Sequence, residues 1–338
     1  PSHLRILSSL SRRPRRPVAL GRLAREAGLT AAGLDGELAR MEGQGYGLER
    51  GPRGIRLVAE PDRLYPERLM RGLETDRLGR ELQSFQTIGS TNDRALQLGE
   101  KGAADGTVLV ADRQTRGRGR RGRAWALAED KGLAFSVILR PALPAAEAPG
   151  LTLAAAVAVA RTLEEWKVRP RIKWPNDLFL GGRKVCGILT ETRGREDKIN
   201  FAVVGVGVNL NQAAGDFPPE LRATATSLFR HRGIRVDRAA FFRRLLLHLE
   251  KAEGWVRRRQ FHRVLAEWRR RSFLNGRQVR IREADRTLYG QVQGVDETGA
   301  LLVRNDWGMV ERVLAGDVEL LRLSRRRPRP GIRKRGGA

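Results

Sequence analysis

The segment "FAVVGVGVNLN" at 201–211 places the tightest constraint on how this chain can fold. Successive side chains of a β-strand point to opposite faces, so the segment has two very different sides. The apolar side, which can pack against a core, consists of Ala202, Val204, Val206 and Val208. The other side carries Gly205, Gly207 and Asn209, and glycines leave a backbone open to close approach. The segment therefore predicts a buried strand whose open side contacts either something flat, such as a ligand, or a crossing segment of the chain.

Other strand and helix patterns surround this segment between residues 80 and 270. The β-rich runs are "GTVLVADRQ" (106–114) and "LAFSVILRP" (133–141), and the helical runs are 151–166 and 237–250, the second with a cap at Asp237. "DLFLGGRKVCGILTET" (177–192) predicts a hairpin that turns at Gly181-Gly182. Its register would place Lys184 opposite Phe179, with Lys184 and Cys186 on one face. This block is predicted to form a mixed α/β domain.

Two smaller units flank the block. Residues 1–64 show a helix, then helix–turn–helix and a hairpin around "RGPRG", which is typical of a winged helix. Residues 272–323 show short strands with "DETG" and "NDWG" turns, which fit an SH3-like β-barrel. We therefore predict an α+β protein with a winged helix at 1–64, a central mixed α/β domain at 65–271, an SH3-like barrel at 272–323 and a disordered basic tail at 324–338.

Charge and cysteine content limit the partners and the compartment. The chain has 65 Lys+Arg against 38 Asp+Glu, a formal net charge of +27, which favours nucleic acids, nucleotides or acidic proteins as partners. Its one cysteine, Cys186, excludes an internal disulfide. The longest apolar run, "LAAAVAVA" at 153–160, is far shorter than the roughly 20 residues that span a bilayer. We expect a cytoplasmic protein that does not contact membranes.

The arginine loop, "GRGRRGR" at 117–123, concentrates positive charge on a glycine-rich segment. It could be an RNA-binding tract, a solvated surface loop or a lid over an anionic reactant. It lacks the lysine and hydroxyl of the phosphate-binding pattern G-x-x-x-x-G-K-[ST]. It occurs once, between two strands, whereas RNA-binding tracts are longer and repetitive. This placement favours a lid, with guanidinium groups that pair with carboxylate or phosphate oxygens.

Two further motifs carry polar groups. In "GSTNDRAL", Ser90 with Asp93 forms a helix-cap pattern, and Thr91 and Asn92 add groups that suit a polar ligand beside free helix N–H groups. The cap alone would also explain this stretch. "KWPND" at 173–177 precedes Lys184, and a lone lysine on a strand is usually just exposed to solvent.

Together these motifs are far more specific than any of them alone. S-T-N, Q-x-x-G-R-G-R-R-G-R-x-W, K-W-P-N-D, R-K-x-x-G-I-L and G-x-G-x-N occur in that order. This series resembles the biotin protein ligases over residues 84–270. With both flanking units, the chain resembles the bifunctional ligases of bacteria that also repress the biotin operon.

The resemblance implies a reaction and a set of roles. ATP, with Mg²⁺, would activate biotin as biotinyl-5′-adenylate, and a lysine of the biotin carboxyl carrier protein would then accept the biotin. The implied catalytic residues are Lys184, Arg118 and Arg120, and the protein itself is expected to supply no metal ligands. The implied biotin-binding residues are Ser90, Thr91, Asn92, Gln114, Gly117, Arg118, Gly119, Arg120, Lys184 and Gly187. The implied residues for ATP and the adenylate are Arg118, Arg120, Arg121, Trp125, Asn176, Lys184 and Asn209.

The resemblance also implies operator DNA as a partner and a homodimer when the adenylate is bound. The candidate DNA contacts are Arg22, Arg25, Thr30, Arg40 and Arg53. A recognition helix from Thr30 would bury Leu34, Leu38 and Met41 and expose Asp35 and Glu37, whose charge opposes DNA phosphates. Two alternatives stay open: a lipoate or octanoate transferase of the same superfamily, and a nucleic-acid-binding protein that uses the arginine loop.

Overall fold

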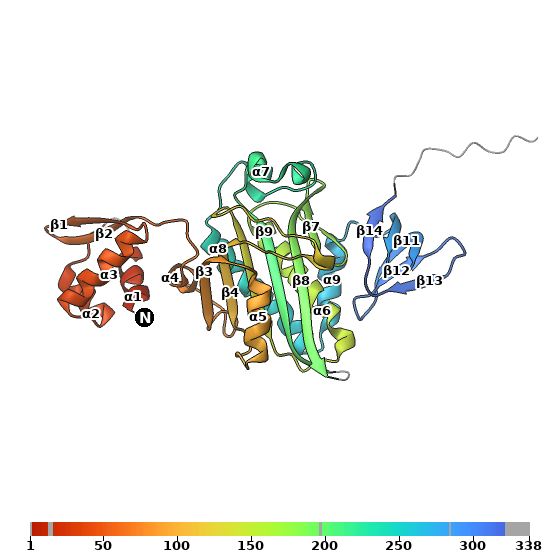
Figure 1. Ribbon diagram of the computed structural model, residues 1–338, viewed down its shortest axis with the longest axis horizontal. Coiled ribbons are helices and arrows are strands. Elements are labelled where there is room, and N and C mark those ends of the chain that lie inside the picture. The colour runs from red at the N-terminus through yellow and green to blue at the C-terminus, as the bar shows by residue number, and fades with distance from the viewer. Residues whose placement is uncertain (1, 13–15, 196–197, 284, 322–338) are drawn as a thin grey trace, which may run out of the picture.

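The structure is a computed structural model that describes residues 2–12, 16–195, 198–283 and 285–321. The predicted tail at 324–338 lies outside the described residues. A helical unit at the N-terminal end, a large central sheet with its helices, and a smaller β unit at the C-terminal end follow one another along the long axis (Figure 1).

The N-terminal unit consists of helices followed by a hairpin, as the sequence predicts. Its elements are α1 (Ser2–Ser11), α2 (Leu20–Ala27), α3 (Ala31–Gly43), β1 (Gly47–Gly51) and β2 (Gly54–Ala59). Thr30 caps α3, because its side chain accepts a hydrogen bond from the Gly33 N–H at 3.2 Å. The predicted inner face of α3 is confirmed: Leu34, Leu38 and Met41 are buried in the core of this unit.

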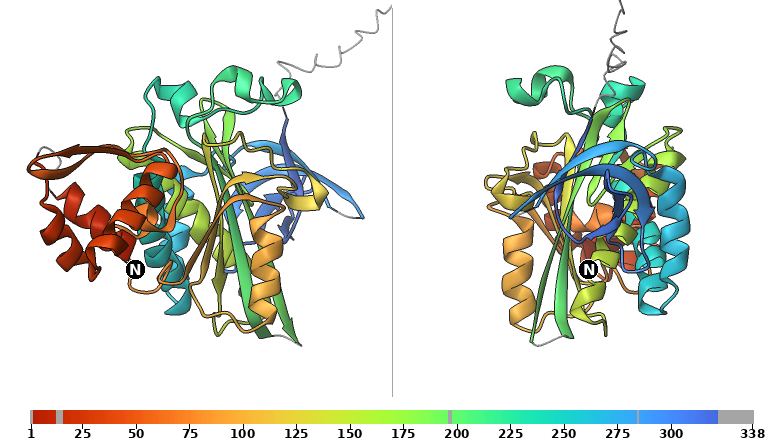
Figure 2. Two further views of the ribbon diagram at one scale, coloured as in Figure 1. Left: turned by 60° about the vertical axis from the view of Figure 1, so that its left-hand side comes forward. Right: turned by 90° about the vertical axis from the view of Figure 1, so that its right-hand side faces the viewer.

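The central sheet is mixed, with strand order β3-β4-β5-β9-β8-β7-β6. Its strands are β3 (Leu82–Ile88), β4 (Val108–Gln114), β5 (Gly132–Leu139), β6 (Arg171–Lys173), β7 (Asp177–Leu180), β8 (Arg183–Arg195) and β9 (Lys198–Asn209). Helix α5 (Thr91–Glu100) covers one face, and α6 (Pro149–Glu165), α8 (Arg238–Arg257) and α9 (Phe261–Arg271) cover the other (Figure 2). The short helix α7 (Leu228–Arg232) lies beyond one end of the strands. The sheet thus lies between the single helix α5 on one face and a layer of three helices on the other.

The apolar side of β9 packs as predicted. Val204, Val206 and Val208 belong to the main core, which α6 and α8 also line. Helix α6 is buried along most of its length because it is built from small and branched apolar residues. Asp237 caps α8 by accepting the N–H groups of Ala239 and Ala240. The glycine side of β9 is left to face the α5 layer.

The β7–β8 hairpin differs from its predicted register. It turns at Gly181-Gly182, where both φ angles are positive (+55° and +77°), and it pairs Phe179 with Lys184 as expected. A bulge follows directly and shifts the alternation by one residue. Lys184 therefore shares a face with Gly187, whereas Cys186 is buried in the core, and burial raises the pKa of its thiol. The prediction that Lys184 and Cys186 share one face is wrong.

The C-terminal unit is an antiparallel sheet with strand order β13-β12-β11-β10-β14. Its strands are β10 (Gln278–Arg282), β11 (Thr287–Val295), β12 (Leu301–Arg304), β13 (Val310–Val313) and β14 (Asp317–Leu320). Trp174 of the "KWPND" motif fastens this unit to the central sheet: its buried indole N–H donates to the Gly299 carbonyl at 3.0 Å. Part of that motif is therefore structural.

The segment between the N-terminal unit and the central sheet is also fixed. It contains α4 (Pro66–Met70) and the acidic Asp62. Arg238 is fully buried, and its guanidinium binds Asp62 at 3.0 Å and the buried Asp112 at 2.9 Å. Burial raises the pKa of Asp112, and the charge of Arg238 opposes that rise. This connection is a packed element that holds the N-terminal unit in place.

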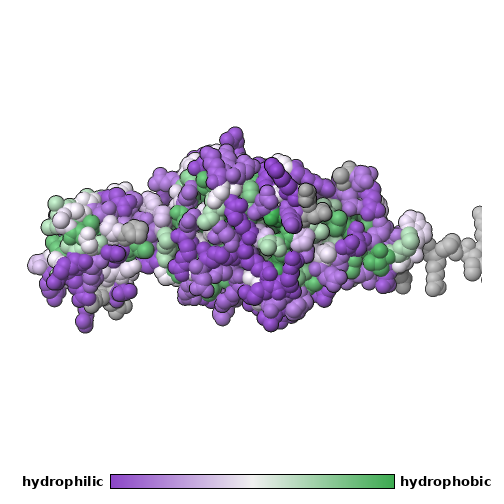
Figure 3. All heavy atoms as spheres, turned by 90° about the horizontal axis from the view of Figure 1, so that it is seen from below, coloured by the Kyte–Doolittle hydropathy of each residue, from purple (hydrophilic) through white to green (hydrophobic). Residues whose placement is uncertain are grey.

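Hydrophilic residues cover much of the face that Figure 3 shows. Within the helices that the structure describes, none is long and apolar enough to cross a membrane. One surface ion cluster joins α6 to α8. Glu165 accepts hydrogen bonds from Arg244 at 2.7 and 2.8 Å and lies 2.7 Å from the Nε2 atom of His248. Hydrogen bonds from Arg244, with a further contribution from His248, lower the pKa of Glu165 to about 2.

This cluster predicts a pH-dependent loss of stability. A carboxyl group with a lowered pKa in the folded state stabilises the fold above its ordinary pKa and loses that contribution as the pH falls through its folded value. Because Glu165 is partly exposed, we expect Glu165→Gln to reduce the free energy of unfolding by about 1 kcal/mol at about pH 7, and the difference to shrink between about pH 5 and pH 2. Denaturant unfolding across this range, with the exposed Glu220→Gln as control, measures it. A constant difference down to about pH 2 would contradict the assignment.

Candidate active site

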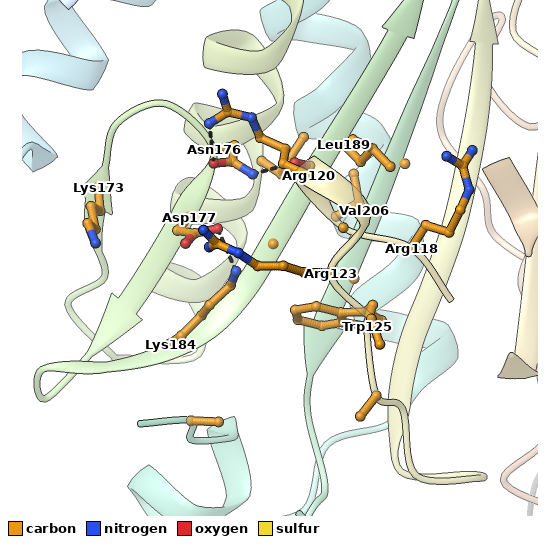
Figure 4. A pocket seen from close by; sticks show the side chains of 18 of the residues that line it. Arg118, Arg120, Arg123, Trp125, Lys173, Asn176, Asp177, Lys184, Leu189 and Val206 are labelled. Atoms are coloured by element: carbon orange, nitrogen blue, oxygen red, sulfur yellow. Dashed lines mark hydrogen bonds and ion pairs between the residues drawn. The ribbon is translucent and has the colours of Figure 1, made fainter. Parts of the chain in front are cut away.

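The motifs that the sequence analysis singled out meet around one cavity of about 590 Å³ (Figure 4). The cavity lies over the glycine side of β9, between the arginine loop, the "KWPND" segment and the edge of the C-terminal sheet. Predicted site residues that line it are Ser90, Thr91, Asn92, Gln114, Arg118, Gly119, Arg120, Trp125, Asn176, Lys184, Gly187 and Asn209. Residues more than 100 positions apart in the sequence are thus brought together.

One end of the cavity is a network of hydroxyl and amide groups. Ser90 caps α5 and accepts from the Asp93 N–H at 3.3 Å. The backbone N–H and hydroxyl of Thr91 donate to the Oε1 atom of Gln114 at 2.8 and 3.1 Å. The buried Ser136 hydroxyl lies 2.8 Å from the Thr91 Oγ1 atom and donates to the Asn92 Oδ1 atom at 2.6 Å. The sequence analysis did not identify Ser136, whose only signal was a polar residue within an otherwise apolar strand.

The open side of β9 is filled by the chain itself. A Cβ atom on Gly205 would lie 2.0 Å from the Asn92 Oδ1 atom, and one on Gly207 would lie 2.4 Å from the Trp125 ring. No larger residue fits at either position without moving these side chains. The flat objects that approach the strand are therefore an amide and an indole of this protein, and they form walls of the cavity.

Trp125 is held from two directions. Its backbone N–H donates to the Gly117 carbonyl at 2.9 Å, and its ring lies 5.7 Å from the Lys184 ammonium. Its indole N–H is buried and makes no hydrogen bond to any described residue. The ring therefore offers a flat apolar surface with a spare donor beside a cation.

Cationic side chains converge on the other end of the cavity. The Lys184 ammonium lies 2.7 Å from the Asp177 carboxylate. Arg120 reaches the Asn176 side chain and the Gly316 carbonyl, each at 3.4 Å, and burial lowers its pKa. Lys173, the first residue of "KWPND", also faces the cavity, and burial lowers its pKa. Lys173 has no predicted role from the sequence, because no pattern in the sequence indicates that its side chain faces the cavity.

Two predicted residues, Gly117 and Arg121, are not among the described residues that line the cavity. Gly117 supports Trp125 through its carbonyl. Arg121 points to the C-terminal sheet, where it donates to Asp317 and to the Arg282 carbonyl, both at 3.1 Å. Arg123 binds the same Asp317 carboxylate. These contacts hold the arginine loop against the C-terminal unit.

Arg118 also has protein partners. Its guanidinium binds Asp93 at 2.6 Å and Glu191 at 2.9 Å. It thus lies across the hydroxyl end of the cavity, away from Lys184 (Figure 4). The loop's arginines have different partners, although the sequence makes them look equivalent.

The carboxylates beside the cavity are paired with cationic side chains of the protein. Across the described residues there is no group of three or more His, Cys, Asp or Glu side chains that could hold a metal ion. The nearby Asp177 and Asp317 are paired with Lys184 and with the arginine loop. These residues do not form a complete metal site of their own.

The predicted DNA contacts lie in the N-terminal unit, apart from this cavity. Arg22 pairs with Glu26 at 2.6 Å, and Arg25 donates to the Gly21 carbonyl at 3.3 Å. Thr30 uses its side chain as the cap of α3, and Arg53 is exposed between β1 and β2.

One expectation about α3 is partly wrong. Glu37 turns toward α1, where it accepts hydrogen bonds from Arg40 at 2.9 Å and lies 3.0 Å from the Nδ1 atom of His3. Hydrogen bonds from Arg40 and His3 outweigh burial and lower the pKa of Glu37. The acidic charge on the exposed side of α3 is therefore smaller than the sequence alone suggests.

Comparisons with known proteins agree with this arrangement. Residues 84–209 match the Biotin/lipoate A/B protein ligase family, and residues 275–321 match the Biotin protein ligase C terminal domain. The chain is 38% identical over 279 residues to the bifunctional ligase/repressor BirA of Bacillus subtilis, across 82% of this chain and 86% of that protein. It is 34% identical over 278 residues to the biotin–[acetyl-CoA-carboxylase] ligase of Mycobacterium tuberculosis, across 78% of this chain and 100% of that protein.

A solved structure is similar as well. The biotin protein ligase of Aquifex aeolicus in complex with biotin and ATP aligns with a TM-score of 0.62 at 30% identity. The alignment covers 72% of this chain and 99% of that chain.

The close approach to β9 generates a prediction. Gly207→Ala should push the Trp125 ring out of the cavity wall and reduce the free energy of unfolding by about 1–3 kcal/mol. We expect a red shift of tryptophan emission that is absent in a Trp125→Phe background. Gly215→Ala, where a Cβ meets nothing within 4 Å, is the matched control. If Gly207→Ala is as stable as this control, the close approach of Trp125 does not require a glycine at residue 207.

Proposed function

The chain belongs to the biotin protein ligase family, and we propose that it activates biotin with ATP and transfers it to a lysine of a biotin carboxyl carrier protein. The observation that carries the proposal is that one cavity has a hydroxyl and amide network at one end and Lys184, Arg120 and Lys173 at the other. Such a site suits a small acid whose polar head group is neutral and whose carboxylate must meet a phosphate. Its volume of about 590 Å³ lies within the usual range for small-molecule sites.

The first half-reaction joins two anions. A biotin carboxylate oxygen attacks the α-phosphorus of ATP, the bond to the bridging oxygen breaks, and pyrophosphate leaves. Negative charge builds on the phosphate oxygens in the transition state, so fixed cations at that point lower the barrier. We assign this role to Lys184 and Arg120. We propose that Lys173 and the Arg282 end of the C-terminal sheet bind the phosphates that leave.

The second half-reaction needs a protected intermediate. The amine of the carrier lysine attacks the acyl carbon of the adenylate, and AMP leaves as the acyl–phosphate bond breaks. Water would compete for the same carbon, so the arginine loop must exclude it until the carrier docks. Arg121 and Arg123, both bound to Asp317, close the loop against the C-terminal unit. This supports a role for that unit in retaining ATP and the adenylate.

Further roles follow from position. Ser90, Thr91, Asn92 and Gln114 would hold the biotin head group, with Gly187 as floor. Trp125 would stack on adenine. Asn176 and Asn209 border the nucleotide, and because the Asn209 amide already donates to the Thr226 carbonyl at 3.1 Å, it acts as a rigid wall. Mg²⁺ bound together with ATP would supply positive charge for the pyrophosphate that leaves.

We also propose the finer architecture that the sequence predicts: a winged helix at 1–64, a catalytic domain at 65–271 and an SH3-like unit at 272–323. The helices and hairpin of the first unit and the antiparallel sheet of the last support it. A homodimer in the adenylate-bound state and a cytoplasmic location remain predictions.

Biotin-dependent pyrophosphate exchange tests the enzyme directly. We expect exchange with biotin and none with lipoate or octanoate, and Lys184→Ala should reduce it by at least about 10²-fold because a charged donor is lost at the reacting phosphate. Lys251→Ala, on the exposed side of α8, is the control for loss of a positive charge. Lipoate-dependent exchange would favour the lipoate alternative, and near-normal exchange in folded Lys184→Ala would remove Lys184 from the mechanism.

A second function, repression, is favoured by the N-terminal unit and by the similarity to bifunctional ligase/repressors. We propose that exposed basic residues, Arg22, Arg25, Arg40 and Arg53, contact the DNA backbone, and that α3 with its Thr30 cap approaches the groove. Arg22 and Arg40 also pair with nearby carboxylates, so phosphates would have to displace those partners.

Binding to the promoter of the organism's biotin-synthesis genes, with and without biotin and ATP, tests this role. We expect tighter binding when the adenylate can form. Arg53→Ala should weaken binding to all DNA and reduce the salt slope by about one, whereas Arg277→Ala in the C-terminal unit should leave both unchanged. Equal affinity for operator and random DNA in both conditions would leave the ligase as the sole function.

A further inference from the structure

Glu191 lies on β8 outside the motifs that define the family resemblance, yet it binds two residues that line the cavity, Asn92 and Arg118. One of its oxygens, Oε2, accepts from the Asn92 amide at 2.9 Å and from the Arg118 guanidinium at 2.9 Å. Its Oε1 atom accepts from the same guanidinium at 3.0 Å. The carboxylate is mostly buried, with 21% of its side chain exposed. A single side chain therefore contacts both the arginine loop and the end of the cavity formed by hydroxyl and amide groups, where the biotin head group is proposed to bind.

Two carboxylates hold the Arg118 guanidinium in place. Asp93 and Glu191 place two carboxylates within 3 Å of its Nη2 atom. Burial acts to lower the pKa of Arg118, but hydrogen bonding to Glu191 and the charges of both acids outweigh it and raise that pKa. With two anions around one cation, the local charge is negative. This guanidinium thus has little remaining attraction for an anionic ligand, unlike Arg120, which lies beside Asn176.

The Asn92 amide is oriented by the same carboxylate. Its Nδ2 atom donates to Glu191 and to the Leu189 carbonyl, and its Oδ1 atom accepts from Ser136 at 2.6 Å. With both of its ends engaged, the amide has one orientation in the cavity wall. Loss of the Glu191 charge would weaken both this orientation and the hold on Arg118.

We propose that Glu191 is a positioning residue that latches the arginine loop over the head-group end of the cavity, through Arg118, while it orients Asn92. The identity of the bound head group rests on the proposed function, but the latch itself does not. In this proposal Arg118, which the family resemblance implied as a catalytic residue, closes the site instead, and Arg120 faces the reacting groups. Glu191→Gln should therefore affect biotin more than ATP.

Limited proteolysis tests the latch in the ligand-free protein. The loop contains several arginines, so trypsin cuts it whenever it opens. We expect Glu191→Gln to speed cleavage within residues 116–123 by about fivefold, since a charge-assisted hydrogen bond at a partly exposed pair is lost. Glu100→Gln is the matched control. Glu100 of α5 pairs at 3.4 Å with Arg193, which is on β8 like Glu191, and this pair does not involve the loop. Asp93→Asn, which removes the other carboxylate from Arg118, should also speed cleavage.

Kinetics test the link to biotin. In pyrophosphate exchange, Glu191→Gln should raise KM for biotin about fivefold and leave kcat and KM for ATP within about twofold. In an Arg118→Gln background the same change should have a smaller effect on cleavage, since coupled residues are not additive. The latch would be overturned if the wild type shows biotin-dependent exchange and Glu191→Gln has the same KM for biotin and the same rate of tryptic cleavage as the wild type. If the wild type shows no biotin-dependent exchange, the proposed function fails, and the proteolysis still decides whether Glu191 holds the loop.

Discussion

The close approach of two side chains to the glycines of β9 is the constraint on which the site depends. Gly205 and Gly207 leave room for the Asn92 amide and the Trp125 ring directly against the strand backbone. Asn92 belongs to the first turn of α5, and Trp125 follows the arginine loop, so this one strand fixes both walls. Its valine side packs against the helices behind the sheet, which keeps the strand from shifting. A rigid core on one face thus sets the shape of the cavity on the other.

Charge is distributed among the loop's arginines by their partners. Arg118 is bound to Asp93 and Glu191, and Arg121 and Arg123 are bound to Asp317 at the C-terminal sheet. Along the chain, Arg118 precedes Arg120, and Arg121 and Arg123 follow it. We therefore propose that closure of the site and chemistry belong to different residues of one short segment. The C-terminal sheet holds one side of this loop through Asp317, which is the basis for the proposal that the sheet helps to retain ATP.

The connection to the N-terminal unit is held to the central sheet and its helices by ion pairs of the buried Arg238. Arg238 is fully buried and binds Asp62 of the connecting segment together with Asp112 of β4. Breaking a buried pair of this kind leaves an uncompensated charge, which typically costs about 3–5 kcal/mol. Arg63 of the same segment binds Asp130, shortly after the arginine loop, at 2.8 Å. The DNA-binding proposal thus concerns a unit that is packed onto the catalytic part.

Sequence alone determined the elements whose evidence is local: the strand with valines on one side, the caps Ser90, Thr30 and Asp237, the turn at Gly181-Gly182, and the ordered motifs that carry the family resemblance. Tertiary structure decided what depends on long-range contact. The bulge after Lys184 separated it from Cys186, because a one-residue shift in pairing leaves no mark in the sequence. The structure adds Ser136, Lys173 and Glu191 to the residues at or around the site and shows that Arg121 does not line the cavity. These differences arise because packing across the fold sets the partner of each side chain. Composition could supply the arginines, but only the folded chain determined which carboxylate each of them meets.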